Sequence, residues 1–154
     1  MRKVEIYQGI PGSGKSTAVK RSVKETKEAF DAKVEVVSAD HYFTDSDGNY
    51  KFEPSGIKAA HNACQTKYLR RLEQGYNHVL VDNTNIYLWE LAYYVGVANV
   101  FKYDLHIVRV NCPVGVALKR GVHGVPEETV QRMAAQMEDP FPFWGTIREV
   151  DGQA

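Results

Sequence analysis

The sequence GIPGSGKST spans residues 9–17 and follows a short run, KVEIYQ at 3–8, that is typical of a β-strand. Its spacing, Gly9-x-x-x-x-Gly14-Lys15-Ser16, is the Walker A pattern, in which a glycine-rich loop joins a strand to a helix. Glycines let successive backbone N–H groups point inward without a Cβ in the way, and the following helix adds its N-terminal dipole. The loop is therefore predicted to hold a nucleoside triphosphate.

Each residue type in this loop has a predicted role. Lys15 is expected to reach the β- and γ-phosphates, Ser16 to ligate Mg²⁺, and Thr17 to contact the α-phosphate. ATP and Mg²⁺ are the expected cofactors, although no segment identifies the base, so ATP and GTP both stay open. The residues expected to bind the nucleotide are Gly9, Pro11, Gly12, Ser13, Gly14, Lys15, Ser16, Thr17 and, from a later segment, Arg120.

Short β-branched runs alternate with longer helix-compatible stretches along the rest of the chain, which predicts a parallel sheet flanked by helices. Strands are expected at 4–8, 34–38, 78–82 and 105–110, and a late one at 145–150. Helices are expected from the loop to about 30, and at 55–74, 89–101, 114–120 and 126–137. We predict an α/β protein with the P-loop NTPase fold, four to five strands, a single domain over 1–154, and a small helical lid at about 113–137.

The helix expected at 55–74 has an apolar side and a basic side. Ser55 is expected to cap its start and Gly75 to stop it. The apolar residues at helical spacing are Ile57, Ala60, Cys64, Tyr68 and Leu72, and the basic residues are Lys58, Lys67, Arg70 and Arg71. The basic side is interpreted either as a solvated face or as a surface for a polyanion.

Two aspartates follow strands at the edge of the sheet where the ligands of open α/β proteins bind. Asp40 follows VEVVSA at 34–39, and Asp82 closes HVLVD at 78–82. Both are expected to face the phosphates. One carboxylate would help to hold Mg²⁺, and the other would accept the proton of an attacking hydroxyl. Motors and switches need a group that positions water, and nothing in the sequence resembles one.

A phosphotransferase also needs a mobile cationic lid that neutralises developing charge. Arg120 is the best candidate, because it lies just before the glycine-flanked link GVHG at 121–124. Arg132 and then Lys119 are the next candidates. For each of the three, the alternative is an ordinary surface charge.

Four segments in this order resemble the P-loop kinases of the polynucleotide 5′-kinase group, including a less characterised branch of kinase-like modules. They are GIPGSGKST at 9–17, SADHYF at 38–43, VDNTN at 81–85 and RGVHGVPEETVQRM at 120–133. The resemblance covers about 4–137 and implies transfer of the γ-phosphoryl group of ATP to the 5′-hydroxyl end of DNA or RNA. It implies Asp40 as the general base, Asp82 as an orienting carboxylate and Arg120 as the lid arginine. With Lys15, these are the expected catalytic residues.

The sequence departs from the family at two places. Phe43 stands where the family has an arginine that holds the acceptor phosphate, and GVHGV at 121–125 lacks a second lid arginine. Phe43, Tyr42 and His41 are interpreted either as a stacking platform for a base or as simple packing. The alternative acceptors are a nucleoside, a sugar or another small hydroxyl compound. A further alternative is a regulatory nucleotide-binding module that transfers nothing.

The composition limits the possible partners. The chain has 19 basic and 19 acidic residues, so no global field attracts nucleic acid and any polyanion site must be a local patch. The two cysteines, Cys64 and Cys112, favour a reduced intracellular protein over a disulfide framework. The sequence shows neither the apolar core of a signal peptide nor a transmembrane run, so we expect a cytoplasmic protein without a membrane partner. The tail at 151–154 is expected to fray.

Overall fold

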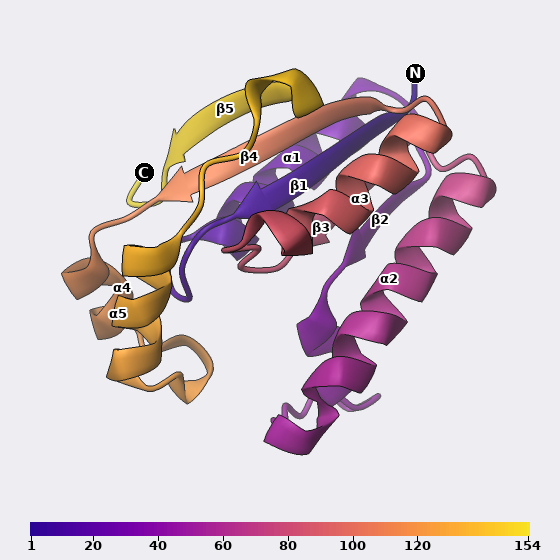
Figure 1. Cartoon of the computed structure of the whole chain (residues 1–154). Helices are drawn as coiled ribbons and strands as arrows, with labels where there is room; N and C mark the ends of the chain where they lie inside the picture. Colours follow the sequence, from indigo (N-terminus) through magenta and orange to yellow (C-terminus); the bar gives the residue numbers. More distant parts are fainter.

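The computed structural model describes all residues from 1 to 154 and contains one sheet of five parallel strands in the order β2-β3-β1-β4-β5 (Figure 1). The strands are β1 (Lys3–Gln8), β2 (Val34–Val37), β3 (His78–Asp82), β4 (Asp104–Asn111) and β5 (Thr146–Asp151). The predicted α/β fold with a parallel sheet is confirmed, and each expected strand lies within two residues of its predicted bounds.

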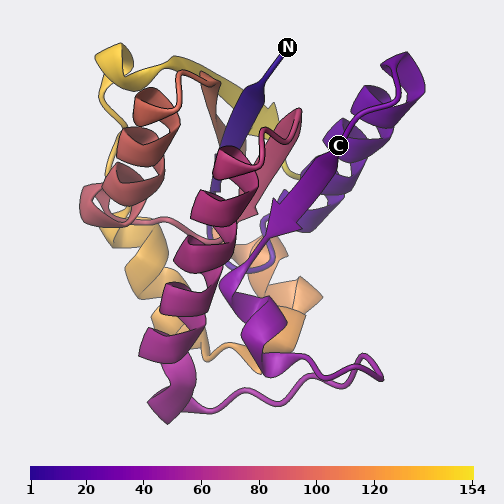
Figure 2. The same cartoon turned by 90° about the vertical axis from the view of Figure 1, so that its right-hand side faces the viewer.

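Helices cover both faces of the sheet, as Figures 1 and 2 show. The helices are α1 (Lys15–Ala29), α2 (Ile57–Glu73), α3 (Leu88–Val100), α4 (Val114–Arg120) and α5 (Glu127–Gln136). The α1 face has a small apolar cluster that includes Val19, whereas the α2 and α3 face has the largest one, which includes Tyr68 and Leu91. The two short helices α4 and α5 pack on a third cluster beneath the P-loop, around Ile10 and Ala117. None of these helices is both long and apolar enough to cross a membrane.

The central strands are buried because both of their faces are covered by helices. In β1, which lies between β3 and β4, five of the six residues are fully buried. The register pairs Tyr7 of β1 with Asp82 of β3, so the carboxyl ends of these strands are level. This alignment brings Asp82 beside the loop that follows β1.

The ends of α2 differ in part from the prediction. Ser55 lies in a 3₁₀ turn, Pro54–Gly56, and the α-helix begins only at Ile57, so Ser55 is not its N-cap. Ile57 is also exposed, because it precedes the part of the helix that packs on the sheet. Gly75 ends the helix as expected: its φ is 72°, and its N–H donates to the carbonyl of Leu72.

The tail at 151–154 is not frayed at its first residue. Asp151 belongs to β5 and pairs with Asn111 of β4. The N–H of Gly152 then donates to the carbonyl of Asn111 at 2.7 Å. A Cβ on Gly152 would lie only 1.8 Å from the carbonyl oxygen of Ser13. The expectation of a loose tail is therefore wrong at Gly152, which packs directly against the P-loop.

A buried polar network crosses the α1 side of the sheet and was not apparent from the sequence. Its centre is the fully buried carboxylate of Glu5, which lies 2.7 Å from His78 Nε2 and 2.5 Å from Arg148 Nη2. The Ser22 hydroxyl of α1 also donates to Glu5. Burial alone would raise the pKa of Glu5, but hydrogen bonds from His78 and Ser22 outweigh it and lower the pKa to about 2.

Candidate active site

The P-loop has a backbone that only glycine can follow at two positions. Gly12 and Gly14 have φ angles of 78° and 105°, in the left-handed region. A Cβ at Gly12 would lie 2.5 Å from the carbonyl oxygen of Ala117, and one at Gly14 would lie 2.6 Å from that of Gly152. Ser13 between them is fully buried, and its hydroxyl has no hydrogen-bond partner within the chain. The loop is thus held between α4 and the segment after β5.

Lys15 begins α1 and turns its ammonium group back toward the loop. Its Nζ donates to the carbonyls of Gly9 and Ile10, at 2.9 Å each. Burial lowers the pKa of Lys15 to about 8, although the charges of Asp82 and Asp40 oppose this shift. Lys15 therefore interacts electrostatically with both of the aspartates that the sequence singled out.

Asp82 lies beside Ser16, the residue that the sequence assigned to the metal ion. The Ser16 hydroxyl donates to Asp82 Oδ2 at 3.0 Å. Burial raises the pKa of Asp82, whereas Lys15 and Ser16 act in the opposite direction. Mg²⁺ prefers oxygen ligands and is usually held by one or two protein groups together with substrate phosphates. Ser16, with Asp82 behind it, fits this requirement.

The segment after Asp82 connects the main parts of the site. Asn83 Oδ1 accepts from the N–H of Ala39 at 2.9 Å, and the Thr84 carbonyl accepts from the N–H of Gly9 at 3.0 Å. Asn85 is buried with a left-handed φ of 47°, and its Nδ2 donates to the carbonyl of Tyr7 at 2.7 Å. This segment is part of the VDNTN motif, but the positioning role of Asn83 and Asn85 was not apparent from the sequence. Two amides directly after a buried strand were the available signal.

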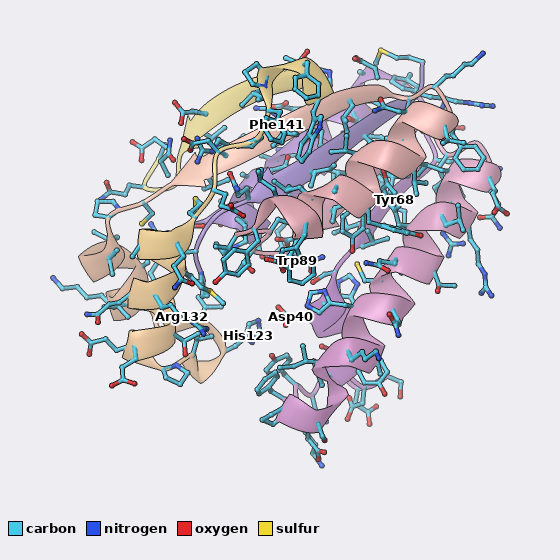
Figure 3. All side chains as sticks on the ribbon, in the orientation of Figure 1. Asp40, Tyr68, Trp89, His123, Arg132 and Phe141 are labelled. Carbon is cyan, nitrogen blue, oxygen red and sulfur yellow. The ribbon has the colours of Figure 1, made fainter.

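Asp40 lies in a 3₁₀ turn, Ala39–Phe43, that Ser38 caps through a hydrogen bond from the N–H of Asp40. Its side chain is 53% exposed, so a hydroxyl compound can reach the carboxylate. The Tyr50 hydroxyl donates to Asp40 Oδ1 at 3.3 Å, and His123 Nε2 lies 3.7 Å from Asp40 Oδ2. His123 has a left-handed φ of 56°, and its ring lies on that of Tyr50 with the centroids 4.1 Å apart. The link between α4 and α5 therefore contacts the loop that contains Asp40 (Figure 3).

The three lid candidates have different surroundings. Arg120, at the end of α4, donates to the carbonyls of Gly12 and Gly152 at 2.9 and 3.0 Å. Arg132 of α5 lines the cleft and has no side-chain hydrogen bond or ion pair within the chain. Lys119 is exposed and does not line the cleft. Arg120 and Arg132 are therefore the two arginines of the lid region that can face a ligand.

One cleft of about 1020 Å³ joins most of these residues. Among the residues predicted from the sequence, those that line it are Pro11, Gly12, Gly14, Lys15, Ser16, Thr17, Asp40, Asp82 and Arg120. Gly9 and Ser13 are buried residues of the same loop that do not line the cleft. The fold thus brings the expected nucleotide residues and both aspartates to a single cleft.

The basic side of α2 is not continuous with this cleft. Lys67 Nζ lies 2.8 Å from Glu35 Oε1, and Arg71 Nε lies 3.4 Å from the same oxygen. Lys58 and Arg70 are exposed and do not line the cleft. Two of the four basic side chains are therefore paired with β2, and this favours the solvated-face interpretation over a phosphate track.

Comparison with solved structures shows the same fold in several nucleotide-binding proteins. The Kti12 protein of Chaetomium thermophilum, solved in complex with ADP-AlF3, is 15% identical with a TM-score of 0.67, and the match covers 96% of this chain and 88% of that one. A chain of the Pnkp1/Rnl/Hen1 complex is 24% identical with a TM-score of 0.62, covering 81% of this chain and 40% of that one. The APS kinase CysC of Mycobacterium tuberculosis is 16% identical with a TM-score of 0.62, covering 97% and 89%. The fold is therefore that of the P-loop NTPases.

Comparison of sequences gives a relative and a family. Human NEDD4-binding protein 2 is 28% identical over 133 residues, which are 83% of this chain and 7% of that protein. The chain therefore spans only a small part of the length of this relative. A family model described as an AAA domain, AAA_33, matches residues 4–140. Because that match includes the P-loop, both aspartates and the lid, the chain belongs to the AAA domain family AAA_33 and has a kinase-like P-loop domain.

Proposed function

We propose that this chain is an ATP- and Mg²⁺-dependent phosphotransferase whose acceptor is the 5′-hydroxyl end of DNA or RNA. The observation that carries the proposal is that a half-exposed carboxylate, Asp40, lines the same cleft as Lys15 and Ser16 of the P-loop. A general base must be open to the incoming hydroxyl and close to the phosphoryl group that is transferred. In this proposal, residues 1–154 form one domain that acts in the cytoplasm, and residues at about 113–137 form its lid.

The proposed reaction assigns one task to each group. The acceptor oxygen forms a bond to the γ-phosphorus while the bond from that phosphorus to the β,γ-bridging oxygen breaks, which releases ADP. Asp40 takes the proton of the acceptor hydroxyl. Lys15 and Arg120 stabilise negative charge on the phosphates, and Ser16 and Asp82 hold the metal site. Mg²⁺, when bound, would neutralise charge on the β- and γ-phosphate oxygens.

The choice of acceptor is supported by the order of the four motif segments and by the kind of proteins with this fold. One structural neighbour belongs to a complex described as an RNA repair complex, Pnkp1/Rnl/Hen1. Others are described as a sugar kinase and as an APS kinase, which act on small molecules. A small hydroxyl compound is therefore the second candidate acceptor. The third candidate function is that of a regulatory module that catalyses no transfer.

The test is transfer of labelled γ-phosphate from ATP to 5′-hydroxyl oligonucleotides and to a panel of nucleosides and sugars. Asp40→Asn should lower the rate by at least about 10²-fold, because a general base is lost, while the affinity for ATP stays nearly intact. Asp47→Asn is a matched control, because Asp47 is an exposed aspartate of the same loop that does not line the cleft. It should leave the rate unchanged.

The outcomes separate the three candidate functions. Labelling of oligonucleotides but not of nucleosides or sugars supports the proposal, whereas the reverse pattern identifies a small-molecule kinase. ATP binding without transfer to any acceptor, together with indifference to Asp40→Asn, identifies a regulatory module. Lys15→Ala cannot separate them, because it should abolish both binding and transfer.

A further inference from the structure

Aromatic side chains line the cleft beside Asp40. Phe43 is the centre of a group of four rings, here called the aromatic cluster, which also includes Tyr42, Tyr50 and Phe52. Its centroid lies 5.3 Å from that of Tyr42, 6.3 Å from Tyr50 and 5.2 Å from Phe52. Phe43, Tyr50 and Phe52 line the cleft, and Tyr42 and Phe52 are about half exposed. The cluster is thus packed within itself but remains open to the cleft.

A second aromatic pair lines the same cleft at the start of α3. Trp89 is 73% exposed, and its ring is nearly parallel to that of Tyr87, with an interplanar angle of 8° and a centroid distance of 6.4 Å. Figure 3 shows Trp89 on the Asp40 side of α3, near the gap between α2 and the lid. A tryptophan left this open to water keeps a large face free to bind another planar group.

The cleft residues contributed by 38–90, which include these rings, contain no lysine or arginine. All of the lysines and arginines that line the cleft belong to α1 or to the lid region, and they are Lys15, Arg21, Arg120 and Arg132. The ionisable residues contributed by 38–90 are Asp40, His41, Tyr50, His61, Asp82, Tyr87 and Glu90. Residues 38–90 therefore offer a strand phosphate no permanent positive charge in the cleft, and Phe43 is the central ring of the aromatic cluster there.

We propose that the acceptor is held by stacking of its terminal base on the aromatic cluster and Trp89, and not by ion pairs to strand phosphates. The inference rests on the proposed function and specifies how that site recognises its acceptor. Stacking tolerates every base because each has a π-face, so the site should accept all bases. The ring of His123 lies on Tyr50, so this face of Tyr50 is covered by the lid, and the exposed rings that line the cleft, Phe52 and Trp89, are the ones left open to a base.

The first experiment changes the acceptor and leaves the protein untouched. Two 5′-hydroxyl oligonucleotides are compared, one of them with an abasic 5′-terminal residue. Loss of the terminal base should raise the acceptor KM by about tenfold or more. The acceptor KM should also depend weakly on salt, with a log–log slope shallower than about 1, because few or no phosphates are neutralised. Equal use of the abasic end, or a steep salt slope, would overturn the inference.

The second experiment changes the protein and uses a matched control. Trp89→Ala should raise the KM for the oligonucleotide by about tenfold and leave the KM for ATP unchanged. Phe143→Ala is the control, because Phe143 is an equally exposed aromatic, at 81%, that lies outside the cleft. It should leave both constants unchanged. If the two variants behave alike, Trp89 has no part in acceptor binding.

A binding measurement separates the inference from the proposed function. The chain has two tryptophans, Trp89 and Trp144, so in a Trp144→Phe variant the tryptophan fluorescence comes from Trp89 alone. An oligonucleotide with a terminal base should quench its fluorescence, and the abasic one should quench it far less. Base-dependent quenching without phosphoryl transfer would support the stacking site while the proposed function fails. Transfer without base-dependent quenching would leave the function standing and overturn the stacking site.

Discussion

The side-chain amide oxygen of Asn83 accepts a hydrogen bond of 2.9 Å from the backbone N–H of Ala39, the residue before Asp40. Asn83 is almost fully buried, and its Nδ2 contacts Cys64 Sγ at 3.6 Å. The turn that carries the proposed base is therefore fixed to the end of β3 and does not depend on its own short 3₁₀ hydrogen bonds alone.

Asn83→Ala should lower kcat by about 10- to 10²-fold, because small displacements of a catalytic group are costly. The affinity for ATP should change little, since the P-loop keeps its own contacts. Asn99→Ala is a control, because Asn99 is an exposed asparagine of α3 that does not line the cleft. Steady-state kinetics below the melting temperature of each variant would measure the effect. An unchanged kcat for Asn83→Ala would show that Asp40 needs no such anchor.

Gly152→Ala should disturb the P-loop from outside, because a Cβ there would lie 1.8 Å from the Ser13 carbonyl oxygen. The clash is with backbone atoms, so the loop or the end of β5 must shift, at about 1–3 kcal/mol of unfolding free energy. ATP binding should weaken together with stability, as isothermal titration and urea unfolding would show. Gly96→Ala in α3 is the control: no atom lies within 4 Å of its added Cβ, so it should stabilise the protein by about 0.5–1 kcal/mol.

Glu5 should make the protein sensitive to acid. Its folded pKa of about 2 lies below the ordinary value of 4.5, so the unfolded chain binds more protons between these two values. The stabilisation, about 3 kcal/mol, is therefore complete above pH 4.5 and is lost as the pH falls through 2. Glu5→Gln should flatten this part of the stability profile, which urea unfolding at several pH values would reveal. The same slope in both proteins would assign the acid sensitivity to other carboxylates.

His123 should hold the lid against the loop that carries Asp40. Its ring contact with Tyr50 is of a kind worth about 0.5–1.5 kcal/mol. His123→Asn removes the ring but suits the left-handed backbone, whereas His123→Ala also opposes that backbone. Amide hydrogen exchange at 121–125 should become faster in both variants, and more so in His123→Ala. Exchange as slow as in the wild type would show that the contact does not restrain the lid.

The sequence predicted the fold well because its signals were local. The P-loop spacing and the β-branched runs identified all five strands, and the apolar stripe of α2 was correct at four of its five positions. Asp40 and Asp82 were placed at the correct edge of the sheet for the same reason, since Asp82 ends β3 and Asp40 comes three residues after β2. The roles assigned to these residues stay predictions.

What the sequence could not show depends on contacts between distant segments. In the sequence, Glu5 is one polar residue within a predicted strand. Only the fold brings it to His78 and Arg148, which are 73 and 143 positions away along the chain. Trp89 lies in α3, which is almost wholly apolar, so periodicity could not tell its exposed end from its buried middle. Gly152 looked like part of a loose tail because its packing partner, Ser13, lies at the other end of the chain.

Arg120 donates one hydrogen bond to a carbonyl of the P-loop and one to a carbonyl beyond β5, so it links these two segments. If this guanidinium moves to a phosphate, its hydrogen bonds to both carbonyls are lost together. Two hydrogen bonds to neutral carbonyls are then exchanged for hydrogen bonds to an anionic phosphate, which are stronger but require the phosphate to lose bound water. A change in the segment after β5 that displaces the Gly152 carbonyl would therefore shift the balance between these two positions of Arg120.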